Sequence, residues 1–267
     1  FNFTQRAIVQ DDDAFEFSLA GRQTQNVKFL TDIGALVIFT NNGEWVAEGG
    51  QSGVLTPSAI NLRQYSRNGI ADLPPIEVDS SALYIQNRGN LIRDLKFEFT
   101  IDGYRGNDIT TFSRHLFENY SIRDWCYQRA PQSIVWAARS DGTLLGCTYV
   151  REQEILAWHR HDFQGGDVEN VCVIPEGTED FLYLIVKRTI NGSTKRYIER
   201  LSTREIDDIV EFKGMDSTIT YDGRHTGSDT MTLSGGSAWS NTETLTLTAS
   251  TSTFSASNVG DQVHLYI

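Results

Sequence analysis

Residues 133–145 read Ser133-Ile-Val-Trp-Ala-Ala-Arg-Ser-Asp-Gly-Thr-Leu-Leu145, and this stretch decides the fold. A short apolar run is followed by an Asp-Gly pair and then by a second strand candidate. Asp-Gly tolerates the positive φ angles that a tight hairpin with right-handed strand twist demands. The stretch therefore predicts two antiparallel strands joined at Asp141-Gly142.

Three further stretches follow the same scheme, at residues 35–46, 82–92 and 181–194. Asn42-Gly43 and Asn191-Gly192 are pairs that favour positive φ, so we expect tight hairpins at both. The four turn glycines, which are Gly43, Gly89, Gly142 and Gly192, lie roughly 46 to 53 residues apart, close to the ~40–50 residue period of a propeller blade.

Strand candidates also lie between the hairpins, at residues 96–100, 154–158 and 170–174. Each repeat can therefore supply three or four strands. Stacking such sheets radially protects the edge strands of an all-β protein. We expect a mainly β chain with a β-propeller-like repeat of antiparallel hairpins, forming a whole ring or part of one; a β-sandwich is the alternative.

Two segments interrupt the strand pattern. After Asn107, residues 108–117 place Ile109, Phe112, Leu116 and Phe117 at helical spacing, which predicts a helix. The segment at residues 56–62 predicts a shorter helical turn with Pro57 at its first position. Both should connect blades.

The composition changes after about Val210, where Ser, Thr and Gly begin to dominate. Alternation in residues 243–249 is typical of exposed antiparallel strands, and the acidic stretch at residues 204–211 is the expected junction. We therefore expect a β-propeller-like domain at residues 1–211 and a small Ser/Thr-rich β module at residues 212–267, either complete or truncated.

Composition limits the classes of function. The formal charge of −12 disfavours a surface that neutralises nucleic-acid phosphates. The apolar stretch at residues 34–39 is far too short for a membrane span, which needs about 20 residues.

Cys126, Cys147 and Cys172 match no C-x-x-C spacing, so we expect reduced, partly buried thiols. The chain begins with Phe1, and we expect a piece of a longer polypeptide.

Three sets of residues invite a chemical interpretation. Asp11-Asp-Asp13 could hold a divalent cation, but the rest of an EF-hand loop is missing and a solvated turn is favoured. His159 and His161 share a face of the predicted strand, as two metal ligands or as hydrogen-bonding groups at a strand end. Exposed tryptophans could stack on sugars, although their apolar surroundings favour a core role; they are Trp45, Trp125, Trp136, Trp158 and Trp239.

No catalytic sequence motif is present. The chain has no Gly-x-Ser-x-Gly elbow and no glycine-rich phosphate loop. A pair of carboxylates brought together by the fold would suffice for a glycosidase, which leaves that class open. We assign no catalytic, cofactor-binding or metal-binding residue and expect a protein that is not an enzyme.

Five ordered stretches between about Phe15 and Leu201 carry a family resemblance. They read Leu36-Val-Ile-Phe-Thr-Asn-Asn-Gly-Glu-Trp45, Gln128-Arg-Ala-Pro-Gln-Ser-Ile-Val-Trp-Ala-Ala-Arg-Ser-Asp-Gly-Thr-Leu-Leu-Gly-Cys-Thr-Tyr149, Arg151-Glu-Gln-Glu-Ile-Leu-Ala-Trp-His-Arg-His-Asp162, Val171-Cys-Val-Ile-Pro175 and Arg196-Tyr-Ile-Glu-Arg-Leu201. Together they resemble a family of phage and prophage virion proteins related to the tail tubular protein B, or nozzle, proteins of short-tailed phages.

The resemblance implies a structural subunit with a β-propeller, located in the virion tail and made in the bacterial host cytoplasm. It implies a homo-oligomeric ring that contacts other tail or head-tail proteins around the channel of DNA ejection, without catalytic residues or cofactors. Family members are usually longer, and residues 212–267 look more like an added small Ig-like module. A carbohydrate- or receptor-binding module is the alternative function, and a glycan-degrading tail enzyme is the third possibility.

Overall fold

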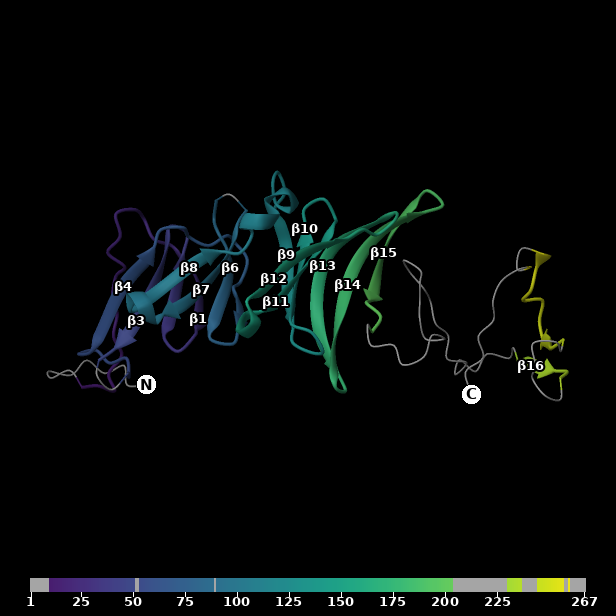
Figure 1. Cartoon of the computed structure of the whole chain (residues 1–267), viewed down its shortest axis with the longest axis horizontal. Helices are drawn as coiled ribbons and strands as arrows, with labels where there is room; N and C mark the ends of the chain where they lie inside the picture. Colours follow the sequence, from purple (N-terminus) through teal and green to yellow (C-terminus); the bar gives the residue numbers. More distant parts are fainter. Residues whose placement is uncertain are drawn as a thin grey trace. The chain divides into compact units, whose positions relative to one another are not determined.

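The computed structural model describes residues 10–50, 53–88, 90–203, 230–236, 244–256 and 259. In this part the chain is mainly β, with antiparallel sheets and three short 3₁₀ helices (Figure 1). The chain divides into two compact units, Phe1–Asp216 and Ser217–Ile267. The expectation of a mainly β chain built from antiparallel hairpins is confirmed.

The described residues of the first unit form four sheets, which we number in chain order. The first sheet comprises β1 (Val27–Asp32), β2 (Leu36–Thr40), β3 (Gly43–Gly49) and β4 (Ile60–Ser66). The second comprises β5 (Ile76–Val78), β6 (Ser81–Ile85), β7 (Ile92–Glu98) and β8 (Gly103–Asp108). The third comprises β9 (Ile122–Gln128), β10 (Ile134–Arg139), β11 (Leu144–Val150) and β12 (Ile155–His161). The fourth comprises β13 (Gly166–Glu176), β14 (Glu179–Ile190) and β15 (Ser193–Arg200). In each sheet, strands adjacent in sequence are hydrogen-bonded neighbours.

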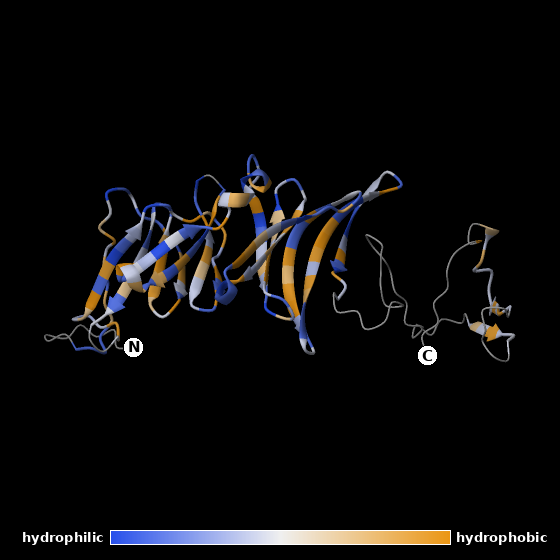
Figure 2. Cartoon of the chain, viewed as in Figure 1, coloured by the Kyte–Doolittle hydropathy of each residue, from blue (hydrophilic) through white to orange (hydrophobic). Residues whose placement is uncertain are grey.

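The four sheets stack face to face in chain order. One buried cluster joins the first and second sheets through residues such as Val46 and Tyr84, and a second joins the second and third. In β10, Val135 contributes to this second cluster, whereas Trp136 contributes to a third cluster shared with the fourth sheet. Both faces of β10 are therefore buried, which explains why its sequence is a continuous apolar run rather than an alternation. Figure 2 shows hydrophobic residues along the strands of all four sheets.

This arrangement has the blade-after-blade order of the expected propeller-like repeat. The four predicted hairpins are present as β2-β3, β6-β7, β10-β11 and β14-β15. The additional strands predicted at residues 96–100, 154–158 and 170–174 coincide largely with β7, β12 and β13. Among the described residues, no buried cluster joins the fourth sheet back to the first.

The hairpin turns differ in their use of glycine. Asn191 and Gly192 have φ of 49° and 77°, as predicted, and Gly142 has φ of 89°. The tight hairpin predicted at Asn42-Gly43 is present, but its turn residues are Asn41 and Asn42, because Gly43 pairs with Thr40 inside the sheet, and neither Asn42 nor Gly43 has positive φ. Glycine is required there for close packing, since a Cβ on Gly43 would lie 2.7 Å from the carbonyl oxygen of Ser66.

Neither of the two segments predicted to be helical forms an α-helix. Residues 108–117 contain only the 3₁₀ segment η2 (Thr111–Leu116), broken by the non-helical backbone of Ser113. The carboxylate of Asp108 accepts bonds from the N–H (2.8 Å) and hydroxyl (2.6 Å) of Thr110, a local turn that competes with a helix. Phe112 is 96% exposed, so it does not share the buried face of its neighbours. As expected, this segment connects two sheets.

The segment at residues 56–62 forms no helical turn. Thr56 makes an isolated bridge to Ala59, and β4 begins at Ile60. The other 3₁₀ helices are η1 (Phe99–Ile101) and η3 (Arg151–Gln153), and both connect strands within a sheet.

In the second unit the structure describes one antiparallel pair, β16 (Met231–Ser234) and β17 (Thr246–Ala249). The strand predicted in residues 243–249 corresponds to β17. The expected acidic junction and the boundary between residues 211 and 212 lie outside the described residues. None of the helices in the described part of the chain has the length and apolar character needed to cross a membrane.

Candidate functional site

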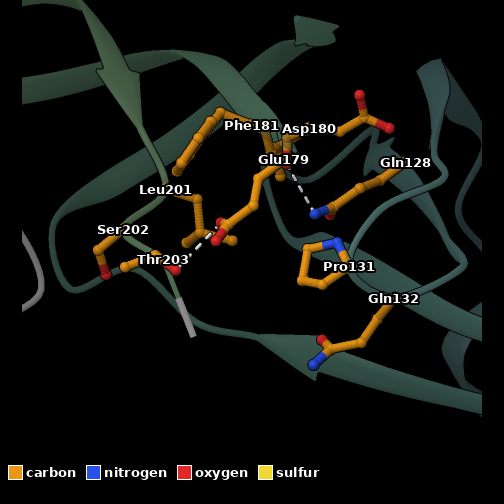
Figure 3. Close-up of a pocket in the computed structure, with 10 residues that line it drawn as sticks. Gln128, Pro131, Gln132, Glu179, Asp180, Phe181, Leu201, Ser202 and Thr203 are labelled. Atoms are coloured by element: carbon orange, nitrogen blue, oxygen red, sulfur yellow. Dashed lines mark hydrogen bonds between the residues drawn. The ribbon is translucent and has the colours of Figure 1, made fainter. Parts of the chain in front are cut away.

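A hollow of about 310 Å³, open to solvent, lies where the third and fourth sheets meet. It is formed by the β9-β10 loop, the start of β14 and the chain after β15, as Figure 3 shows. Its lining residues are Gln128, Pro131, Gln132, Glu179, Asp180, Phe181, Leu182, Leu201, Ser202 and Thr203.

The polar groups of this hollow are largely engaged in joining the two sheets. The side-chain amide of Gln128 donates to the carbonyl oxygen of Asp180 (2.8 Å) and accepts from the indole N–H of Trp136 (2.8 Å). The carboxylate of Asp180 accepts from the backbone N–H of Arg129 (2.8 Å) and of Ala130 (3.1 Å). These hydrogen bonds join the third sheet to the fourth at the hollow, so its polar groups contribute to a structural junction.

A second carboxylate fastens the same two sheets. Asp124 on β9 accepts from the backbone N–H of Val171 (3.0 Å) and more weakly from the side chain of Asn170 (3.4 Å), both on β13. Bonds between a carboxylate and a backbone N–H are stronger than neutral ones. Asp124 and Asp180 thus fix the position of the fourth sheet on the third.

His159 and His161 lie on one face of β12, as predicted. His159 Nδ1 and His161 Nε2 are 2.9 Å apart, and both rings contact the indole of Trp136. Gly146 provides room for this pair, because a Cβ there would lie 2.2 Å from Cε1 of His159. The described residues contain no group of three or more potential metal ligands. The observed contacts are those of hydrogen-bonding histidines at a strand end.

The aspartates of the predicted solvated turn make ordinary turn contacts. Asp13 accepts a hydrogen bond from the backbone N–H of Gln10 (2.8 Å), and Asp11 accepts one from the hydroxyl of Ser58 (2.9 Å).

The described tryptophans occupy the interior, as the core interpretation predicts. Trp45, Trp125 and Trp136 are buried, and Trp158 packs partly buried against the cluster between the second and third sheets. The indole N–H of Trp158 donates to the carbonyl oxygen of Ile109 (2.8 Å). Trp239 lies outside the described residues.

The three cysteines are unbridged but differ in exposure. Burial raises the pKa of the Cys126 and Cys147 thiols, to about 12 for Cys147, so both remain protonated at neutral pH. Cys172 is exposed, so the expectation of three partly buried thiols is wrong at that position. The reason is its place on the side of β13 that faces away from the third sheet.

Two buried carboxyl groups were missed by sequence reasoning. Glu44, within the apolar run of β3, is fully buried, and burial raises its pKa despite hydrogen bonds from Ser66 and Tyr84. Asp94, buried on β7, accepts a hydrogen bond from the Tyr149 hydroxyl (2.9 Å), which links the second and third sheets. The burial of Glu44 could have been suspected from the sequence, because this acidic residue lies within an apolar strand.

Arg139 and Asp141 hold the third sheet to the connection that precedes it. The guanidinium makes two bonds to the carboxylate, of 2.8 and 2.7 Å, and a third to the carbonyl oxygen of Leu116 (2.7 Å). It also lies 3.9 Å above the ring of Tyr120. The hydrogen bonds from Arg139 lower the pKa of Asp141 to about 2.

The comparisons with known proteins add no identification. No family model matches the chain, and a search of curated proteins finds no match. In the described part of the first unit, the four sheets are held to one another by apolar clusters and by hydrogen bonds to carboxylates such as Asp94 and Asp124.

Proposed function

We propose that this chain is a structural component of a bacteriophage virion, in the tail nozzle or tail-tube assembly through which DNA is ejected. The observation that carries the proposal is the face-to-face stacking of the four sheets, because a rigid body of this kind suits a mechanical role. The chain acts as a platform whose loops contact neighbouring subunits.

The residues of the family resemblance support this assignment. Two consecutive stretches, which together form the run at residues 128–162, cover the end of β9 and β10, β11 and β12. This sheet packs on both faces; its Asp124 accepts a hydrogen bond from Val171 of the fourth sheet, and the loop after β9 donates two backbone hydrogen bonds to the carboxylate of Asp180. The resemblance therefore involves the part of the unit that holds its neighbours in place.

The charge of the chain also supports a role beside moving DNA. A wall rich in Lys and Arg would bind phosphates and retard the nucleic acid, whereas an acidic or neutral wall would not. With a formal charge of −12, the chain should show no saturable binding to duplex DNA in fluorescence anisotropy at about 0.1–0.2 M salt. Saturable binding in that range would contradict this role.

The decisive experiment is made on virions. Particles purified from the phage or lysogen that encodes the chain should contain it at a fixed ratio to the other tail proteins, measured by quantitative mass spectrometry. Immunogold labelling should place it at the tail. Deleting its gene should leave filled heads that do not infect, and supplying the gene in trans should restore infectivity. Absence from particles, or full infectivity after deletion, would refute the proposal.

A further inference from the structure

Asparagine is followed directly by glycine at three places in the chain, which are Asn42-Gly43, Asn68-Gly69 and Asn191-Gly192. In such a pair the backbone nitrogen of the glycine can attack the side-chain carbonyl carbon of the asparagine. Glycine favours this attack, because it has no Cβ to block the approach and its backbone rotates freely. The three pairs consist of the same two residues, so differences in their reactivity come from the fold.

The pair Asn191-Gly192 forms the tip of the β14-β15 hairpin. Both residues are exposed, and they lie outside the ladder, whose last pair joins Ile190 to Ser193. Among the residues that the structure describes, none hydrogen-bonds to the Asn191 carboxamide. Figure 1 shows the tip projecting beyond the neighbouring strands, and the strand residues next to it are exposed. A turn with so few contacts opens readily by local fluctuation.

The pair Asn42-Gly43 is held in the first sheet. Gly43 is buried and pairs with Thr40 across the β2-β3 turn. The side-chain amide of Asn42 donates to the carbonyl oxygen of Thr24 (2.8 Å), and its backbone N–H donates to the Thr40 hydroxyl (3.3 Å). The nitrogen of Gly43 therefore cannot turn toward the Asn42 side chain unless this end of the first sheet opens.

The pair Asn68-Gly69 is held between the turn after β2 and the end of β6. Gly69 is buried, and a Cβ there would lie 2.1 Å from the carbonyl oxygen of Asn41. The carbonyl oxygen of Gly69 accepts from the backbone N–H of Asn87 (3.0 Å). The side-chain amide of Asn68 donates to the hydroxyl oxygen of Ser66 (2.9 Å). Both residues of this pair are thus fixed by their neighbours.

We propose that Asn191-Gly192 is a site of spontaneous deamidation and that the fold protects the other two pairs. The backbone nitrogen of Gly192 gives up its proton to water and forms a bond to Cγ of Asn191, and the side-chain nitrogen leaves as ammonia. This step closes a succinimide ring. Water then opens the ring at either of its two carbonyl carbons, which gives aspartate or isoaspartate. The reaction consumes water and releases ammonia, and it needs no oxidant, reductant or cofactor.

The two products affect the hairpin differently. Aspartate keeps the turn, in which Asn191 has φ of 49°, because Asp-Gly also suits positive φ. Isoaspartate adds the side-chain methylene to the backbone, so the lengthened turn no longer holds Ile190 and Ser193 in register. Either product adds a negative charge to a chain with a formal charge of −12. This modification goes beyond the proposed virion role and does not depend on it.

Peptide mass spectrometry on the full chain tests the proposal. The folded chain is incubated at mildly alkaline pH, and each of the three asparagines is followed in the same digest. Asn191 should convert at least about tenfold faster than Asn42 and Asn68, because its turn opens more readily. Chromatographic separation should show both aspartate and isoaspartate at this position. Aspartate alone would overturn the succinimide route, because direct hydrolysis of the side chain gives no isoaspartate.

The unfolded chain is the matched control. In concentrated urea the three pairs lose the contacts that distinguish them, so their rates of conversion should agree within about threefold. Folding should slow Asn42 and Asn68 by at least about tenfold and Asn191 by less than about threefold. If Asn42 or Asn68 converts as fast as Asn191 in the folded chain, or if folding slows all three equally, the proposal is wrong.

Discussion

Breaking the contact between Arg139 and Asp141 should destabilise the first unit by an amount that the structure sets. The Arg139 side chain is 7% exposed and that of Asp141 is 31% exposed. The pKa of Asp141, at about 2 instead of 3.8, corresponds to about 2.4 kcal/mol at 1.36 kcal/mol per unit. Because the carboxylate is partly hydrated, we reduce this to about 1.5–2 kcal/mol for Asp141→Asn at pH 7.

Removing the cation should cost more. Arg139→Met leaves Asp141 without its partner and the carbonyl oxygen of Leu116 without its donor, so we expect about 3–5 kcal/mol. The two losses overlap, because both variants break the same bonds. The double variant should therefore be less destabilised than the sum by about 1–3 kcal/mol.

Urea unfolding of the full chain, followed by tryptophan fluorescence, measures these differences. The matched control is Asp162→Asn, which breaks a pair with the same Arg-x-Asp spacing, Arg160 to Asp162 at 2.9 Å, whose side chains are 55% and 66% exposed. We expect a loss of at most about 0.5–1 kcal/mol there. Equal losses for Asp141→Asn and Asp162→Asn, or strict additivity in the double variant, would refute the reasoning.

The pH dependence gives the sign of the effect. A carboxyl group with a lowered folded-state pKa stabilises the fold above its unfolded pKa of about 3.8, and this stability is lost as the pH falls toward about 2. The difference between wild type and Asp141→Asn should therefore be complete at pH 6–7 and shrink below about pH 4. A difference that grows on acidification would contradict the assignment of the shift to Arg139.

Four further substitutions, used in three tests, probe the interior of the sheets. Burial raises the folded-state pKa of Glu44 above 4.5, so the stabilisation that Glu44 contributes falls as the pH rises past that value. In urea titrations between pH 5 and 8, Glu44→Gln should therefore reduce the dependence of the free energy of unfolding on pH. Leu184→Ala should lower the free energy of unfolding by about 2–5 kcal/mol, because it opens a cavity between the third and fourth sheets; a loss under about 1 kcal/mol in the same titration would contradict the buried interface. Gly146→Ala should destabilise the fold, because the added methyl group overlaps His159. In a thermal melt, adding His159→Ala to this variant should recover most of the lost stability. Failure of this rescue would show that the overlap is not the cause.

The hairpin architecture was predictable because its signals are local. An apolar run, a turn pair and a second run specify two strands wherever they occur, and the four hairpins appear at the predicted places. The continuous apolar character of residues 134–138 agrees with the burial of both faces of β10, although that burial was not among the predictions. The helix predicted at residues 108–117 failed because helical spacing of apolar residues does not outweigh the turn that Asp108 forms with Thr110.

Sequence reasoning placed the two histidines together because they lie two residues apart on a strand. It could not place Asp124 against Val171 or Asp94 against Tyr149, since these partners are 47 and 55 residues apart. Nor could it find the hollow beneath Phe181, whose lining comes from three separated segments. Contacts between residues so far apart in the sequence depend on how one sheet is rotated and shifted over the next.

The sequence by itself thus determined the strands and their hairpin pairing, because both depend on neighbours within about a dozen residues. Only the tertiary structure decided which faces of those sheets meet and which one stays exposed. Ile198 and Ile134 are both aliphatic strand residues, yet one is exposed and the other buried. The physical reason is that burial is a property of the stacked sheets, and no strand carries within itself the identity of the sheet that will cover it.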